Sequence, residues 1–246
     1  MGMPVSVHVR GAGARDAEVD GAVRRVFAEL GALEQVFSTY RASSQVSRLQ
    51  RGELALADCD PAVTEVHRLC GVALERTGGS FDAWSAVAGR PGVFDPTGLV
   101  KTWAVGRASR HLADLCGLDV AVNAGGDVLL RRHPDVDEHA APWLVGIEDP
   151  RDRRRVLATV PVVDGGVATS GSAARGAHVV DPRTGRPAEG VLSATVVGPS
   201  LLWADVWATA AVARGAQALD WVSSLHGTSG MLVLADGRVH RWANAV

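Results

Sequence analysis

A stretch near the C-terminus, Met231-Leu-Val-Leu-Ala-Asp236-Gly237-Arg-Val-His240, predicts an antiparallel β-hairpin. Two runs of alternating side chains flank Asp236-Gly237. An Asp-Gly pair suits the two-residue turns that join antiparallel strands, because such turns need positive φ angles. The hairpin therefore indicates antiparallel strand pairing in the C-terminal part of the chain.

The spacing of apolar residues, and the residue types at the ends of each segment, predict the helices and the other strands. Apolar spacing and caps predict four helices, at residues 14–37, 60–77, 100–116 and 201–224. The second helix is expected to start with Asp60 as its cap and Pro61 in its first turn. Gly31 is a position where the first helix could kink or divide. Short apolar runs between Gly and Pro predict strands at residues 4–9, 143–147, 156–163, 177–180 and 192–198, and one at 120–130 that is interrupted at 123–127.

The predicted fold class is α+β, with mixed, mostly antiparallel sheets and packed helices. Neither a low-complexity linker nor a repeat of fixed period divides the sequence. We therefore expect a single domain over residues 1–246.

Composition excludes several classes of function. The 25 Lys and Arg residues against 27 Asp and Glu give a net charge of -2, so we expect no nucleic-acid partner. Apolar runs fall short of the ~18 residues that a membrane span needs. The first eleven residues lack a signal peptide's basic start and apolar segment, so we expect a cytoplasmic protein, with a removed leader left open. Cys59, Cys70 and Cys116 are widely spaced and predict reduced thiols.

Five segments contain more Gly, Asp, Ser and Thr than turns alone require: residues 37–50, 78–101, 123–127, 169–185 and 204–209. Each also has a structural interpretation. The serines of the first segment could simply cap helices, and a histidine beside the turn at residues 181–185 is more often structural than catalytic.

Two of these segments suggest a phosphate or a close ligand. Gly98 leads into a helix beginning near Lys101, where free N–H groups and the positive end of the helix dipole suit phosphate. Alternatively, Gly98 merely ends a strand. In Asn123-Ala-Gly-Gly-Asp127, paired glycines within a strand indicate a bulge or a close ligand. The sequence lacks G-x-G-x-x-G and Walker A motifs, which argues against ordinary dinucleotide and P-loop folds.

Asp205 and Thr209 are four residues apart on a predicted helix, so both side chains share one face. Both offer oxygen, which suits Mg²⁺ if a phosphate and waters complete its coordination. The structural alternative is a first-turn charge at Asp205 and a Thr209 hydroxyl bonded to the carbonyl four residues earlier.

Taken in order, these segments resemble the ApbE family, the FAD:protein FMN transferases, over essentially the whole chain. The matching motifs are Phe37-Ser-Thr-Tyr40 with Ser44 and Ser47-Arg-Leu49, Gly79-Ser-Phe-Asp82, Gly98-Leu-Val-Lys101, Asn123-Ala-Gly-Gly-Asp127, Thr169-Ser-Gly171, His178 before Asp181-Pro-Arg-Thr-Gly185, and Ala204-Asp205 with Thr209.

The resemblance implies a reaction and its partners. Family members bind FAD and Mg²⁺ and transfer FMN to a threonine hydroxyl of a target flavoprotein, forming a phosphoester and releasing AMP. The expected partner is thus an acceptor flavoprotein with a threonine-containing motif. Asp164-Gly165-Gly166-Val167 lacks that threonine, so self-flavinylation is not expected.

The resemblance also implies roles for individual residues. Asp205, Thr209 and the backbone carbonyl of Gly98 are the expected metal ligands, and His178 and Lys101 are the expected catalytic residues. His178 would accept the threonine proton, because a neutral imidazole can act as a base at pH 7. Tyr40 and Phe81 would be walls for a flat ring. The full set expected to bind FAD is Tyr40, Ser44, Phe81, Asp82, Gly98, Lys101, Asn123, Gly125, Gly126, Asp127, Thr169, Ser170, Gly171 and His178.

The sequence departs from the family at a few positions. Thr102 follows Lys101 where the family has glycine, and Ala83-Trp84 follow Phe81-Asp82 where the family has proline and a longer insertion. Two other functions use the same pocket: an FAD pyrophosphatase that gives FMN and AMP, and a flavin-binding protein without catalysis.

Overall fold

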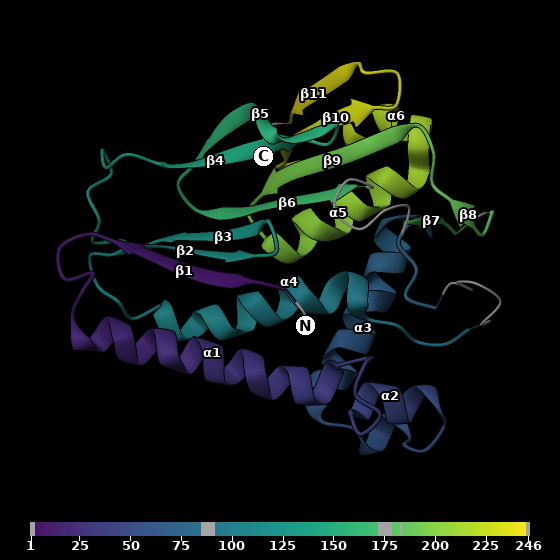
Figure 1. Ribbon diagram of the computed structural model, residues 1–246, viewed down its shortest axis with the longest axis horizontal. Helices are drawn as coiled ribbons and strands as arrows, with labels where there is room; N and C mark the ends of the chain where they lie inside the picture. The colour runs from purple at the N-terminus through teal and green to yellow at the C-terminus, as the bar shows by residue number, and fades with distance from the viewer. Residues whose placement is uncertain (1–2, 85–91, 172–178, 183, 245–246) are drawn as a thin grey trace.

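The fold is built on one seven-stranded sheet (Figure 1). The computed structural model describes residues 3–84, 92–171, 179–182 and 184–244. Every strand pair among these residues is antiparallel, which confirms the predicted α+β class with mostly antiparallel sheets. The sheet order is β1 (Val5–Arg10), β2 (Asp119–Ala124), β3 (Asp127–Arg132), β6 (Gly165–Gly171), β9 (Val191–Gly198), β10 (Ser229–Leu234) and β11 (Val239–Ala243).

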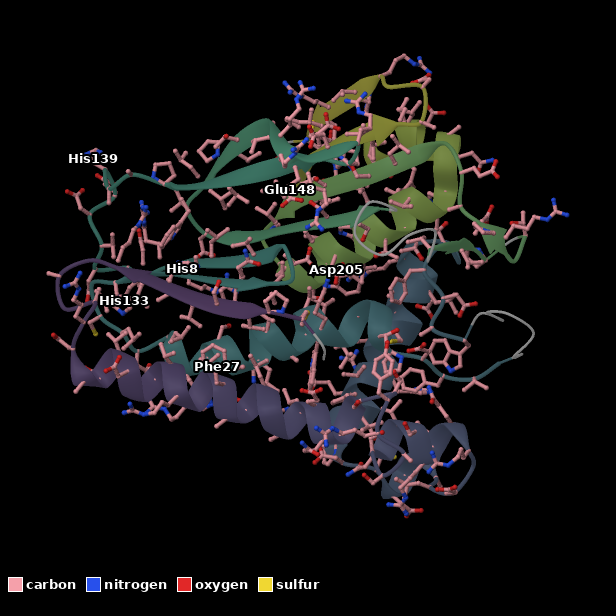
Figure 2. The ribbon with its side chains drawn as sticks, viewed as in Figure 1. His8, Phe27, His133, His139, Glu148 and Asp205 are labelled. Carbon is pink, nitrogen blue, oxygen red and sulfur yellow. The ribbon has the colours of Figure 1, made fainter. Side chains whose placement is uncertain are left out.

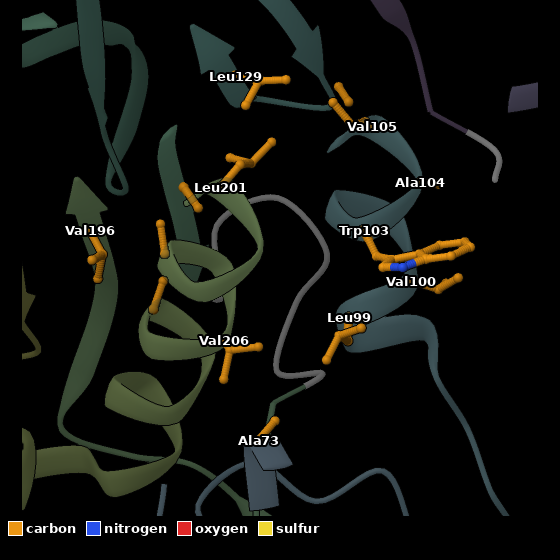
Figure 3. Close-up of a cluster of buried hydrophobic side chains, with 14 of the residues drawn as sticks. Ala73, Leu99, Val100, Trp103, Ala104, Val105, Leu129, Val196, Leu201 and Val206 are labelled. Carbon is orange, nitrogen blue, oxygen red and sulfur yellow. The ribbon is translucent and has the colours of Figure 1, made fainter. Parts of the chain in front are cut away.

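Helices cover one face of the sheet, and a hairpin covers part of the other. Helix α5 (Leu201–Arg214) packs on β6 and β9, α4 (Thr97–Ala108) packs on α5, and α1 (Ala17–Phe37) packs on α4. Their apolar side chains and those of the sheet form the main core, and Figure 3 shows the part of it around α4 and α5. On the opposite face, the hairpin of β4 (Trp143–Asp149) and β5 (Asp152–Val162) buries a smaller apolar cluster.

The remaining α-helices and a short strand pair lie along the right side of Figure 1. They are α2 (Gln45–Gln50), α3 (Pro61–Arg76), α6 (Ala218–Val222), β7 (Val180–Asp181) and β8 (Arg186–Pro187). The Asp60 side chain caps α3 by accepting a hydrogen bond of 2.8 Å from the Ala62 amide, and Pro61 occupies the first turn. This cap and proline are those expected from the sequence.

Several predicted boundaries were wrong. The helix predicted at 100–116 begins at Thr97 and ends at Ala108, followed by a 3-10 turn at Ser109–Leu112. The helix predicted at 201–224 is interrupted at Gly215, whose φ of 58° ends α5. The interruption expected at 123–127 in the strand at 120–130 is confirmed as a turn between two strands, and α1 continues through Gly31 undivided.

Strand β6 was missed, although it lies near the centre of the sheet. Its sequence, GGVATSG, has too many glycines for a strand pattern. The structure explains two of them. A Cβ on Gly166 would collide with the backbone of Leu201, and a Cβ on Gly171 would collide with the carbonyl of Leu192. Glycine therefore lets β6 approach its neighbours closely. Of the strand predicted at 177–180, residues 177 and 178 fall outside the described part, Val179 is not in a strand, and Val180 begins β7.

Candidate functional site

A lysine between two buried aspartates forms the centre of the site. The Lys101 ammonium on α4 makes an ion pair with Asp127 Oδ2 at the start of β3, and it lies 3.5 Å from Asp205 Oδ2 on α5. Lys101 is the only lysine in the chain, and arginines make up the rest of its 25 Lys and Arg residues. Figure 2 labels Asp205 in the interior, where α5 approaches α4. Two carboxylates against one ammonium leave the cluster net negative, a charge that favours a further cation.

The turn that carries Asp127 is explained by its own geometry. Gly125 and Gly126 have φ angles of 64° and 103°, and they join β2 to β3 without a register shift. Asn123 Oδ1 accepts a hydrogen bond of 3.0 Å from the Gly126 amide. The bulge considered from the sequence is therefore absent at this turn, and a hairpin turn accounts for both glycines. Whether this turn also contacts a cofactor stays a prediction.

Both oxygens of the Asp127 carboxylate are occupied. Oδ2 pairs with Lys101, and Oδ1 accepts a hydrogen bond of 3.0 Å from the Thr169 amide on β6. Thr169 is held in turn by a hydrogen bond of 2.8 Å between its hydroxyl and that of Thr195 on β9. Asp127 therefore acts as the fixed counter-ion of Lys101 and ties β3, β6 and α4 together.

The Asp205 side chain is buried, which the sequence alone did not decide. It lies in the second turn of α5, beyond the first turn that the structural alternative assumed. Burial raises the pKa of its carboxyl to about 6; nearby Lys101 opposes that rise and Asp127 adds to it. The Thr102 hydroxyl donates a hydrogen bond of 3.1 Å to Asp205 Oδ2. A carboxyl whose pKa is raised by burial beside charged partners is typical of a functional site.

Thr209 lies one turn after Asp205, as the spacing predicted. Its hydroxyl is 2.8 Å from the Ser170 hydroxyl on β6, and either can donate the hydrogen bond. Two neighbouring residues of β6 thus contact the site. The Thr169 amide binds Asp127, and the Ser170 hydroxyl binds that of Thr209. Strand β6, which the sequence pattern did not predict, is the element that brings these groups together.

Gly98 lies inside the first turn of α4, so the helix begins before it. A Cβ at Gly98 would stand 3.1 Å from Cε2 of Phe81, so the ring packs against a position with no side chain. Phe81 is only 5% exposed and belongs to the main core. This packing explains the glycine, and the carbonyl of Gly98 as a metal ligand stays a prediction.

The remaining predicted residues are dispersed. Ser44 is the N-cap of α2, where it accepts a hydrogen bond of 3.0 Å from the Ser47 amide and donates one of 2.6 Å to the Ser38 carbonyl. Tyr40 is 96% exposed. Asp82 Oδ1 accepts a hydrogen bond of 2.8 Å from the Trp84 amide. His178 lies outside the described residues, so its predicted role is not addressed by the structure.

The donor set of the cluster fits Mg²⁺. In the described part of the chain, Asp205 Oδ1 receives no hydrogen bond, while the Thr209 hydroxyl is one turn away on the same helix. Both are hard oxygen donors of the type that Mg²⁺ prefers. Sequence reasoning found these two residues from their spacing, but it missed Thr102 and Thr195 as members of the network.

A second group of possible metal ligands, Cys116, His133 and Asp135, lies between the loops that flank β2 and β3. Cys116 and Asp135 are exposed. The Nδ1 atom of His133 already accepts hydrogen bonds from the amides of Gly117 at 3.4 Å and Asp135 at 3.2 Å. A cation bound through Nδ1 would have to displace both bonds, and exposed Cys116 and Asp135 side chains are common without a metal, so we assign no metal to this group.

Buried oxygen donors beside a lysine are the chemistry of proteins that bind phosphate groups through a divalent cation. The chain belongs to the ApbE family, whose model matches residues 1–89 and 86–232. It is similar to proteins named FAD:protein FMN transferase from Salmonella typhimurium and Escherichia coli, with 32% and 31% identity over 152 residues. Those matches cover 56% of this chain and 43% and 42% of the relatives' lengths, so they span less than half of each relative.

Solved structures show the same fold. The ApbE protein of Thermotoga maritima superposes with a TM-score of 0.82 at 20% identity, covering 98% of this chain and 94% of that one. The flavin transferase ApbE of Vibrio cholerae gives a TM-score of 0.75 at 20% identity, covering 99% and 94%. The predicted ApbE-like fold and family are therefore confirmed.

Proposed function

We propose that this protein transfers FMN from FAD to a threonine hydroxyl of another flavoprotein, using Mg²⁺ and releasing AMP. The observation that carries the proposal is the buried Asp127–Lys101–Asp205 cluster beside the Ser170–Thr209 pair, in a chain of the ApbE family. Relatives named FAD:protein FMN transferase support the choice of reaction. We treat residues 1–246 as one domain that carries it.

Asp205 and Thr209 would hold Mg²⁺ through side-chain oxygens, and Gly98 would do so through its carbonyl. When bound there, Mg²⁺ would supply positive charge against the FAD pyrophosphate. Lys101 adds a second positive charge whose position Asp127 fixes from the opposite side. Phosphoryl-transfer reactions depend mainly on positioning and on charge neutralisation, and a cation held in place before the reaction supplies both.

The proposed transfer is a single substitution at phosphorus, in which one bond forms and one breaks. The acceptor threonine Oγ forms a bond to the FMN phosphorus while the bond to the AMP oxygen breaks. His178 takes the threonine proton, and AMP leaves with the electron pair of the broken bond. Attack by water in place of threonine gives FMN and AMP, the pyrophosphatase alternative, so the acceptor decides between the two reactions.

The decisive experiment incubates the purified protein with FAD, Mg²⁺ and a flavoprotein domain carrying a threonine acceptor motif. Acceptor mass and AMP release are measured for the wild type, for Asp205→Asn and for Asp58→Asn, a matched change at an exposed carboxylate. We expect an FMN-sized mass gain that Asp205→Asn abolishes and Asp58→Asn preserves. AMP without acceptor modification would favour the pyrophosphatase, and bound FAD with neither product would favour a binding protein.

We also propose a cytoplasmic location. All three cysteines are free, as expected in a reducing compartment, with Cys70 buried and Cys116 exposed. Within the described ranges, the helices are too short or too polar to cross a bilayer. Fractionation of cells that express the full-length protein tests the location directly.

A further inference from the structure

The two aspartates of the cluster use their oxygens differently. Asp127 has both oxygens engaged, one with Lys101 and one with the Thr169 amide. Asp205 has both of its partners among the described residues on a single oxygen: Oδ2 is 3.1 Å from the Thr102 hydroxyl and 3.5 Å from the Lys101 ammonium. Its Oδ1 receives no hydrogen bond from the described residues. Among the described residues, Asp127 thus has a partner on each oxygen, and Asp205 is anchored through one oxygen only.

Thr102 is well placed to provide that anchor. It is 1% exposed, one residue after Lys101 on α4, and faces α5 through its hydroxyl. The hydroxyl also lies 3.2 Å from the Leu99 carbonyl, but it has one proton and donates to one acceptor at a time. An ionised carboxylate is the stronger acceptor, so donation to Asp205 is favoured.

We propose that Thr102 is a positioning residue of this chain, which holds Asp205 through Oδ2 so that Oδ1 alone is presented to the divalent cation. This inference rests on the proposed function, because it assigns Asp205 to the metal site. Glycine at this position, as in the family pattern, lacks the hydroxyl and leaves Lys101 as the partner of Oδ2.

The orientation of Asp205 matters because Mg²⁺ demands near-ideal octahedral geometry at short distances. A carboxylate free to rotate presents either oxygen, or both, and loses entropy when the ion binds. Hydrogen bonds to ligating side chains typically contribute 10- to 100-fold to metal affinity. Thr102 therefore acts on cation affinity rather than on the transferred group.

The test measures Mn²⁺ binding by electron paramagnetic resonance, with Mn²⁺ as a paramagnetic probe for the Mg²⁺ site. Thr102→Val removes the hydroxyl and keeps the shape of the side chain, while Thr102→Ser keeps the hydroxyl. We expect Thr102→Val to weaken Mn²⁺ binding about tenfold or more and Thr102→Ser to restore it to near the wild-type value. The exposed Thr64→Val on α3 is the matched control and should bind as the wild type does.

The outcomes separate this inference from the proposed function. Unchanged Mn²⁺ affinity in Thr102→Val, with binding lost in Asp205→Asn, overturns the role of Thr102 and leaves the metal site standing. Unchanged affinity in Asp205→Asn removes the metal site and the inference together. Thermal unfolding shows whether each variant is folded, and Thr102→Ala replaces Thr102→Val if the latter is not. A higher KM for Mg²⁺ with kcat retained at saturation would agree with a positioning role.

Discussion

Lys101 on α4 and Asp127 on β3 form an ion pair across 26 positions of sequence, and the same ammonium reaches Asp205 on α5. This contact joins the helical layer to the sheet at the point where the candidate metal ligands lie. Lys101 is the only lysine of the sequence. A compact ammonium with three donors can serve two carboxylates in a small space, whereas a guanidinium is planar and larger.

Replacing Lys101 tests this packing and charge argument. Lys101→Met leaves two buried carboxylates without their cation, and removing one partner of a buried ion pair costs about 3–5 kcal/mol of unfolding free energy. Lys101→Arg keeps the charge but replaces a compact ammonium by a larger planar group, so we expect loss of FMN transfer and partial destabilisation. Urea unfolding and the transfer assay measure both effects. Wild-type transfer by Lys101→Arg would show that charge alone suffices.

Cation binding should stabilise the folded protein. A ligand that binds only the native state at 100 times its Kd adds about 2.7 kcal/mol, which is equivalent to several degrees in Tm for a chain of this size. We expect Mg²⁺ to raise the Tm of the wild type and of Asp58→Asn but not that of Asp205→Asn. Differential scanning fluorimetry with and without EDTA provides the measurement. An equal rise in all three proteins would place the cation elsewhere.

Asp119 predicts a pH dependence of stability away from the site. Its buried carboxylate accepts hydrogen bonds from Arg10 at 2.7 Å and Arg132 at 3.1 Å. Burial alone would raise its pKa, but the two guanidinium groups outweigh burial and hold the pKa below its usual value. Because the folded-state pKa is lowered, the stabilisation is fully present above the unfolded pKa of about 3.9 and is lost as the pH falls through the folded value.

Asp119→Asn should therefore lower the unfolding free energy at pH 7, by about 3 kcal/mol since a buried pair is broken. The difference from the wild type should shrink as the pH falls below about 4. Urea unfolding between pH 3 and pH 7 measures this. A difference that is independent of pH would mean that packing, and not charge, accounts for the loss. Asp164→Asn, at an exposed carboxylate paired with Arg131, is the matched control.

Two glycine substitutions distinguish a glycine needed for close packing, Gly166, from one that only lowers helix propensity, Gly31. Gly166→Ala places a Cβ against the backbone of Leu201, so β6 or α5 must move, and we expect a loss of more than about 2 kcal/mol. Gly31→Ala, inside α1 with open space around the added Cβ, should stabilise by about 0.5–1 kcal/mol. Thermal unfolding of both variants tests this. A neutral Gly166→Ala would mean that the contact between β6 and α5 is loose.

The sequence by itself determined the elements whose signals are local. The hairpin around Asp236-Gly237, the cap at Asp60 and the shared helix of Asp205 and Thr209 were predicted correctly, because turn chemistry and the helical repeat depend on neighbouring residues. The connection in that hairpin is longer than a two-residue turn, because it runs over residues 235–238. The order of motifs along the chain indicated the ApbE family, which the family comparison confirms.

Only the tertiary structure decided which groups meet. Strand β6 has no local strand signal, because its glycines serve contacts with Leu201 and Leu192, which are distant in sequence. The hydrogen bond from Thr102 to Asp205 spans 103 positions. Burial of the Lys101 cluster likewise depends on how α4 and α5 pack on the sheet. Pairing across such separations is set by the packing of whole elements, which no local pattern encodes, and it is this pairing that turns separate motifs into one candidate site.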